Sequence, residues 1–321
     1  MNAADQAGDL LKQIGDTRKI LHNLKLWILA VGSVLIGCSG CRGQIASTGL
    51  EVQMEDYSKA RSHFQTHLVR HGSAPQPGET LHAPAGAQQV VYSKTPSLVA
   101  WITPLQRGSQ SRNSTNAGTK KPVVLFLHGG FAIGDDDWQM AQPYRDAGYV
   151  VMMPVLRGEN GQTGDYSMFY DEVKDVVSAA DYLAARPDVD PKHIYAAGHS
   201  VGGTLTLLAA MTTTRFRAAA SFSGSPNQVE WSKSQPELIP FDPKDTREYQ
   251  MRSPIAFATS FKCPVRMYYG SDETLFGTPS QRTAELAKEK KLDVEAVSVP
   301  GDHFTAVPAA MLKSIEFFQS K

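Results

Sequence analysis

A serine between two glycines is the residue of this sequence best placed to do chemistry. Residues 198–202 are Gly-His-Ser-Val-Gly, a G-x-S-x-G pattern between a strand-like run and a helix-like run rich in leucine and alanine. In a strand-to-helix turn, such glycines permit a tight, strained bend that lifts the serine hydroxyl above a sheet. The context favours this over a merely glycine-rich helix start and predicts that Ser200 is a nucleophile, with a helix N-terminus behind it.

A serine hydroxyl needs a base, and His303 is the predicted one. It lies in Pro-Gly-Asp-His-Phe, after the last predicted strand. A third residue should orient its imidazole, and two adjacent carboxylates compete for that role in the loop after the preceding strand, Asp272 and Glu273. We favour Asp272, because aspartate is the commoner choice, although a spacing of three residues from Gly270 would select Glu273. His199 is expected to pack rather than act.

The anion formed when a serine attacks a carbonyl needs two hydrogen-bond donors. One predicted donor is the backbone N–H of Val201, the residue after the nucleophile. The second is assigned to the N–H of Gly130, with Phe131 as the alternate, in the His-Gly-Gly-Phe turn at residues 128–131. The side chains of His128 and Phe131 either line the pocket or pack beneath it.

Alternating apolar strands and amphipathic helices must position these residues. Two β-rich runs form a predicted hairpin, and strands and helices then alternate to the end of the chain. This order predicts an α/β fold with a doubly wound, mostly parallel sheet covered by helices on both faces. The predicted strands are 88–94, 97–104, 122–128, 148–154, 193–198, 216–224, 263–270 and 294–301, and the helices are 171–186, 201–211, 279–291 and 307–318.

Composition excludes several classes of protein. The 32 basic and 32 acidic residues cancel, so no overall charge attracts nucleic acid. With 41% hydrophobic and 20% charged residues, neither wholesale disorder nor a polytopic membrane protein fits. Three cysteines exclude a disulfide-dense scaffold, and Cys263 is expected to be an inert core thiol.

The N-terminal segment has the features of a secretory signal. Basic residues precede an apolar run at residues 26–37, which is shorter than the ~20 residues that span a bilayer. Residues 35–38, Leu-Ile-Gly-Cys, resemble the lipobox of bacterial lipoproteins, which predicts lipidation of Cys38 and a place in the bacterial cell envelope. An uncleaved N-terminal anchor is the alternative. Cys38 and Cys41 form a C-x-x-C that lacks the context of a redox or metal site.

Three domains or segments are predicted. Residues 1–37 are the targeting segment, 38–87 a tether and N-terminal extension, and 88–321 the catalytic domain, with 225–259 as a cap insertion. Residues 55–71 have helical spacing, which would place His63, His67 and His71 on one face. Such a helix spreads the first and last of these over ~12 Å, too far for one ion, so we expect no metal and no organic cofactor.

Several stretches together resemble the α/β-hydrolase superfamily, and more narrowly the prolyl-oligopeptidase-type, dienelactone-hydrolase-like catalytic domain. They are His-Gly-Gly-Phe at 128–131, residues 148–161 with Arg157-Gly158, the turn around Ser200, residues 252–273, and Gly-Asp-His-Phe at 301–304. The resemblance implies hydrolysis through an acyl-enzyme, with peptides as the usual substrates. Thr204 stands where many such peptidases carry an aromatic residue, and His128 where many use a tyrosine.

The sequence therefore predicts a serine hydrolase, foremost a prolyl-oligopeptidase-like serine peptidase. The alternatives are a carboxylesterase or dienelactone-hydrolase-like esterase, a catalytically inactive binding protein on the same fold, and an envelope protein whose residues 39–87 dock a partner. The expected partners are a peptide or small ester substrate and, through the N-terminal segment, a membrane, but no nucleic acid.

Overall fold

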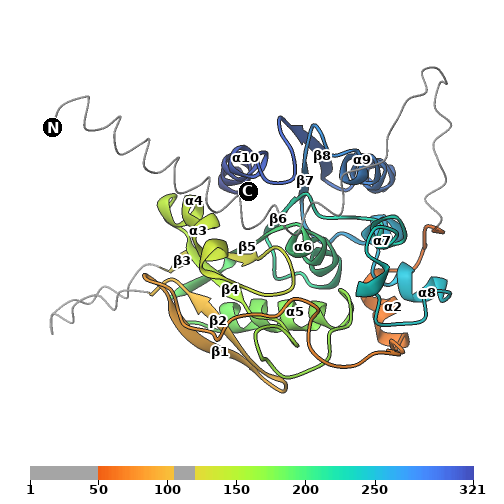
Figure 1. The fold of residues 1–321 in the computed structure, drawn as a ribbon. Helices are drawn as coiled ribbons and strands as arrows, with labels where there is room; N and C mark the ends of the chain where they lie inside the picture. Colours follow the sequence, from red (N-terminus) through yellow and green to blue (C-terminus); the bar gives the residue numbers. More distant parts are fainter. Residues whose placement is uncertain (1–49, 105–119) are drawn as a thin grey trace, which may run out of the picture. The chain divides into compact units, whose positions relative to one another are not determined.

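A computed structural model describes residues 50–104 and 120–321, and within them an eight-stranded sheet has the order β1-β2-β4-β3-β5-β6-β7-β8 (Figure 1). The neighbours from β4 to β8 are parallel, while β1 pairs with β2 and β2 with β4 in antiparallel register. The strands are β1 (Gln88–Lys94), β2 (Ser97–Ile102), β3 (Lys121–Leu127), β4 (Val150–Pro154), β5 (Val189–His199), β6 (Ala218–Phe222), β7 (Val265–Gly270) and β8 (Val294–Val299).

Helices cover both faces of the sheet (Figure 1). This confirms the predicted doubly wound α/β fold, which is that of the α/β-hydrolases. The helices are α2 (Tyr57–His63), α3 (Asp135–Met140), α4 (Gln142–Asp146), α5 (Glu172–Ala184), α6 (Val201–Thr212), α7 (Gln228–Ser232), α8 (Thr246–Gln250), α9 (Thr274–Glu289) and α10 (Val307–Gln319), with 3-10 helices η1 (Pro236–Leu238) and η2 (Pro254–Ser260).

Side chains along each strand alternate between the two faces of the sheet, and this divides the interior into two cores. In β3, Val123 and Leu125 pack with α5, α6 and α9, whereas Val124 and Phe126 pack with α3, α4 and α10. Successive side chains of a strand point to opposite faces, so a strand buried on both sides needs an uninterrupted apolar run. Residues 123–127 of β3 and the whole of β4 meet this need. The parallel strands place their carboxyl ends along one edge of the sheet.

The predicted helix over residues 55–71 is wrong in its length. The helix α2 begins after Asp56, whose carboxylate accepts from the N–H groups of Ser58 and Lys59, and it ends at His63. Phe64 is already extended, and its carbonyl accepts from the hydroxyl of Tyr170 at 2.7 Å. Contacts with a distant part of the chain therefore override local helical spacing.

Residues 64–87 of the extension form no helix, and the three histidines do not share a helix face. His67 donates its backbone N–H to buried Glu248 at 2.6 Å, and His71 contacts Asp165. Among the described residues, no group of three or more histidine, cysteine, aspartate or glutamate side chains could hold a metal ion. The described extension from residue 50 onward belongs to the same compact unit as the sheet.

The segment after β6 carries short helices in place of a strand–helix repeat. Here α7, η1, α8 and η2 follow one another, and Phe241 forms an isolated antiparallel bridge with Leu68 of the extension. The helix α9 also begins earlier than predicted, at Thr274 instead of 279, because the carbonyl of Glu273 accepts from the N–H groups of Phe276 and Gly277 and so forms its first turn.

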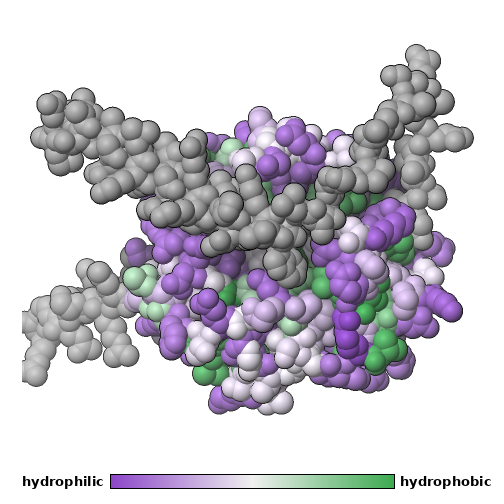
Figure 2. Space-filling view, viewed as in Figure 1, coloured by the Kyte–Doolittle hydropathy of each residue, from purple (hydrophilic) through white to green (hydrophobic). Residues whose placement is uncertain are grey.

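The predicted targeting segment, with Cys38 and Cys41, lies outside the described residues. Within residues 50–104 and 120–321, no helix has both the length and the apolar character needed to cross a bilayer. Figure 2 shows that the visible described surface is largely hydrophilic, with smaller hydrophobic areas between.

Candidate active site

Ser200 lies on the sharp turn between β5 and α6, with φ 54° and ψ −114°. This is a left-handed backbone conformation that a non-glycine residue adopts only under strain. A side chain at Gly198 would overlap the carbonyl of Gly202, and one at Gly202 would overlap the carbonyl of Leu127. The two glycines are therefore required for the turn, as their spacing around the serine predicts.

The structure brings Ser200, His303 and Glu273 together in one chain of hydrogen bonds. The hydroxyl oxygen of Ser200 lies 2.9 Å from Nε2 of His303, and Nδ1 of the same ring lies 2.6 Å from Oε1 of Glu273. The three residues come from the ends of β5, β7 and β8, so the parallel sheet places them at one edge. This geometry permits a hydroxyl proton to pass to an imidazole held by a carboxylate.

The preference for Asp272 as the orienting carboxylate does not match the structure. Asp272 is exposed, and its carboxylate accepts from the neighbouring hydroxyl of Ser271 at 3.0 Å. Glu273 instead turns inward, where Oε2 accepts from the N–H of Gly270 at 2.7 Å and from the hydroxyl of Ser223 at 2.5 Å. These two donors explain why the second of the adjacent carboxylates meets His303.

Ser223 is a residue that the sequence reasoning missed. It follows β6 directly, with φ 49°, and it supports the far oxygen of Glu273. Burial would raise the pKa of Glu273, but hydrogen bonds from His303 and Ser223, with the charge of His303 and the Gly270 N–H, hold that pKa below its usual range. The available signal for Ser223 was its position directly after β6, the strand that lies beside β7.

His199 packs against the candidate base instead of competing with it. Its Nε2 lies 2.8 Å from the backbone carbonyl oxygen of His303, and the two ring centroids are 4.8 Å apart. Because a carbonyl can only accept, Nε2 carries the hydrogen. Burial, together with the charge of His303, lowers the pKa of His199 to about 3, so its ring stays neutral.

The predicted oxyanion turn follows β3. Gly130 has φ 71°, a left-handed conformation that suits glycine, and the carbonyl of His128 accepts from the N–H of Gly202 at 3.1 Å. Val201 is the first residue of α6, where a helix offers its N–H no internal partner. The N–H of Phe131 donates to Oε1 of Gln76, a residue of the N-terminal extension, at 3.1 Å.

The side chain of His128 lies beneath this turn and forms a buried ion pair. Its Nε2 lies 2.9 Å from Oε2 of Glu159, and its Nδ1 lies 3.1 Å from the carbonyl oxygen of Gly129. Both acceptors need a hydrogen from the ring. Burial would lower the pKa of His128, but the charge and hydrogen bond of Glu159 outweigh it and raise that pKa to about 9. His128 is therefore an imidazolium at neutral pH.

Aromatic side chains gather next to the oxyanion turn. The ring of Phe131 lies 5.2 Å from that of Tyr166, 6.3 Å from that of Phe169 and 6.5 Å from that of Trp231, centroid to centroid. Trp231 belongs to the predicted cap insertion. Met168 and Phe169 have φ of 55° and 72°, a strained pair of the kind that clusters at functional sites.

Other predicted residues lie away from this cluster. Phe241 of the cap insertion packs edge-on against Tyr249 and under the guanidinium of Arg252. Cys263 is buried and unpaired, and burial raises the pKa of its thiol to about 12, which suits an inert core residue.

Comparison with known proteins gives a family match over more than half of the chain. The model of the prolyl oligopeptidase family matches residues 136–319. A Bacillus subtilis (strain 168) protein described as "Uncharacterized peptidase YuxL" is 28% identical in an alignment of length 173, and the match covers 47% of this chain and 26% of that protein. From the same organism, "Putative esterase YitV" is 23% identical in an alignment of length 238, and the match covers 62% of this chain and 89% of that protein.

Solved structures show the same fold. A Mycobacterium tuberculosis puromycin-hydrolyzing peptidase has a TM-score of 0.61 at 22% identity, and the match covers 73% of this chain and 38% of that one. The thermophilic esterase Est2 of Thermogutta terrifontis has a TM-score of 0.56 at 20% identity, covering 74% of this chain and 94% of that one. The chain thus spans well under half the length of both named peptidases.

Proposed function

Because the chain belongs to the prolyl oligopeptidase family, we propose that it is a serine hydrolase in which Ser200, His303 and Glu273 form the catalytic triad. The observation that carries the proposal is the pair of hydrogen bonds on His303, 2.9 Å to Ser200 and 2.6 Å to Glu273. Donor and acceptor distances of this length allow proton transfer without rearrangement.

In the proposed reaction, Oγ of Ser200 attacks a carbonyl carbon while its proton passes to Nε2 of His303. The ionised carboxylate of Glu273 holds Nδ1–H and stabilises the imidazolium that forms. His303 then gives its proton to the leaving group, which departs and leaves an acyl-enzyme. Water attacks the acyl carbon in the second half, with His303 again accepting and returning a proton.

The proposed oxyanion hole consists of the backbone N–H groups of Val201 and Gly130. The contact between Phe131 and Gln76 favours Gly130 over Phe131, because the N–H of Phe131 already has an acceptor. Hydrogen-bond donors that already point at the developing anion lower the activation barrier most, because they need not reorient during the reaction. Their effect is larger in a site that contains little water.

A peptide is the first proposed substrate class, since the family consists of peptidases by name. An ester is the second, and one observation favours it: a putative esterase and a solved esterase are among the proteins that this chain resembles. The two classes share one mechanism and differ in the leaving group.

The experiment compares kcat/KM for short p-nitrophenyl esters with kcat/KM for peptidyl anilides, including one with proline on the acyl side. Ser200→Ala serves as the blank. Anilide cleavage that rivals ester cleavage indicates a peptidase, and ester cleavage alone indicates an esterase. Absence of both activities, with no labelling by a fluorophosphonate, would contradict the serine hydrolase and favour an inactive binding scaffold.

We also propose that residues 1–37 direct the chain to the bacterial cell envelope and that Cys38 carries the lipid. The support is the basic, apolar and small-residue order of this segment and its Leu-Ile-Gly-Cys run. Intact mass of the membrane-extracted protein tests this, because a mature chain that starts at any residue other than Cys38 contradicts lipidation.

A further inference from the structure

The N-terminal extension is bound along the loop that follows β4. The N–H of Ala74 donates to the carbonyl of Gly158 at 2.9 Å, and the N–H of Tyr166 donates to the carbonyl of Gly72 at 2.9 Å. Farther along, Nδ2 of Asn160 donates to the carbonyl of Glu79 at 3.1 Å. Residues 72–79 therefore have a defined path and cannot be a free tether.

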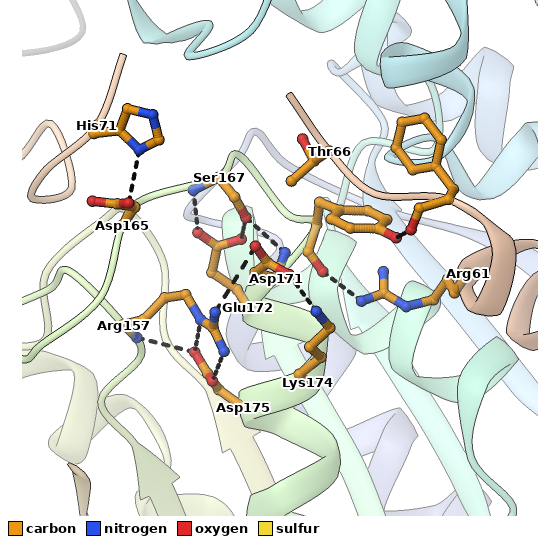
Figure 3. Close-up of polar contacts among 12 residues, drawn as sticks. Arg61, Thr66, His71, Arg157, Asp165, Ser167, Asp171, Glu172, Lys174 and Asp175 are labelled. Carbon is orange, nitrogen blue, oxygen red and sulfur yellow. Dashed lines mark hydrogen bonds and ion pairs between the residues drawn. The ribbon is translucent and has the colours of Figure 1, made fainter. Parts of the chain in front are cut away.

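Polar contacts fix the extension just before this stretch (Figure 3). Nδ1 of His71 lies 2.8 Å from Asp165, and the guanidinium of Arg61 donates to the carbonyl of Tyr170 at 2.8 Å. The pocket beside them, about 370 Å³ in volume, is lined by charged groups that already pair with one another, such as Arg157 with Asp171. We therefore attribute to these residues an anchoring role.

Gln76 is the point at which the extension meets the oxyanion turn. Its Oε1 accepts from the N–H of Phe131 at 3.1 Å and lies only 2.7 Å from the place that a Cβ atom would occupy on Gly130. The glutamine side chain therefore occupies the space directly beside the glycine that is the proposed oxyanion donor, and a side chain at residue 130 would collide with it.

Each of the two peptide groups that flank Gly130 is held by a hydrogen bond with a different side chain. The carbonyl of Gly129 accepts from Nδ1 of His128, and in a trans peptide the N–H of Gly130 points the other way, away from His128. The next peptide group is held by Gln76 through the N–H of Phe131. With both groups held, neither ψ of residue 129 nor φ of residue 130, the two angles that reorient this peptide group, is free to turn the N–H of Gly130 away.

We propose that Gln76 is a positioning residue of the oxyanion hole, acting through Phe131 to hold the Gly130 N–H toward the oxygen of the carbonyl group whose carbon Ser200 attacks. This inference rests on the proposed serine hydrolase function. It makes the extension a part of the catalytic apparatus, whereas its place in the sequence suggests only a tether.

The test compares Gln76→Met, which keeps the length of the side chain and removes the acceptor, with Gln65→Met as the matched control. Gln65 is an exposed glutamine of the same extension. Full-length proteins are assayed for kcat, KM, Tm and the inhibition constant of a boronic acid that forms a tetrahedral adduct with serine. Loss of a whole oxyanion donor costs ~10²–10³ in kcat, so we expect a loss of about 10-fold for a misplaced one.

We expect that Gln76→Met lowers kcat about 10-fold and leaves KM within about two-fold. The inhibition constant of the boronic acid should rise by the same factor by which kcat falls. The control should match the wild type in all four measurements. Unchanged kcat in Gln76→Met, or a loss of kcat without weaker boronic acid binding, overturns the proposal. If wild type neither turns over nor labels with a fluorophosphonate, the serine hydrolase itself is wrong and this inference fails with it.

Gln76→Asn keeps the test decisive if Gln76→Met does not fold. The shorter side chain keeps the amide but withdraws its oxygen from the N–H of Phe131. The proposal predicts a kcat about 10-fold lower, with boronic acid binding weakened by the same factor at unchanged Tm. Wild-type kcat in this variant would overturn the proposal.

Discussion

His199 donates from Nε2 to the backbone carbonyl oxygen of His303 at 2.8 Å. This bond joins the turn that carries the proposed nucleophile to the loop that carries the proposed base. Because burial lowers the pKa of His199 to about 3, the bond persists with a neutral donor throughout the range in which a hydrolase works. His199, the residue next to Ser200, thus positions His303 without taking part in its proton transfer.

His199→Phe should lower kcat by about 10- to 100-fold, because the ring volume stays while the donor to His303 is lost and the imidazole shifts. The measurement is kcat and KM on whichever ester or anilide wild type cleaves. His193→Phe is the control, since that half-exposed histidine contacts Asp190 and lies outside the site. Equal kcat in both variants would contradict the positioning role.

Glu273→Gln should lower kcat by ~10⁴, as loss of the orienting carboxylate does in other triads. Asp272→Asn is the matched control, one residue away and exposed, and should keep kcat within about two-fold of wild type. The rate at which a fluorophosphonate phosphonylates Ser200, with loss of fluoride, reports the same difference before the substrate is known. A larger loss of kcat in Asp272→Asn than in Glu273→Gln would mean that Asp272 is the orienting carboxylate.

Ser223→Ala should destabilise the protein at pH 7 by about 1.5–3 kcal/mol, since it removes a hydrogen bond to a buried charged group. The pKa of Glu273 is lowered in the folded state, so its stabilising contribution is present above its ordinary pKa of 4.5 and is lost as pH falls through the folded value. Urea unfolding at pH 7 and pH 4 should therefore show a smaller difference between variant and wild type in acid. A difference that grows in acid would refute this account of Glu273.

The pair of His128 and Glu159 should stabilise the fold most strongly below pH 6.5. The pKa of His128 rises from 6.5 to about 9 on folding, so its contribution is complete below 6.5 and disappears as pH rises through 9. A shift of this size corresponds to on the order of 3 kcal/mol. The check is Tm against pH for wild type and for the neutral double variant His128→Gln, Glu159→Gln, whose Tm difference should shrink from pH 6 to pH 9. A constant difference would mean that His128 is not charged in the folded protein.

Features encoded in consecutive residues were predictable from the sequence. Neighbouring residues determine the apolar strands and the glycine pair around Ser200, and the order of the elements determines the order of serine, acid and histidine. The parallel sheet then places the carboxyl ends of β5, β7 and β8 at one edge. The sequence alone therefore determined the fold class, the position of Ser200 and its approach to His303.

Tertiary structure decided whatever depended on partners from distant parts of the chain. Asp272 and Glu273 are neighbours of the same charge, and only the inward donors Gly270 and Ser223 select the glutamate. The helix of the extension ends at His63, and its later residues reach the oxyanion turn through Gln76. No local pattern encodes these contacts, because the free energy of burying a polar group is set by the partner that meets it after folding.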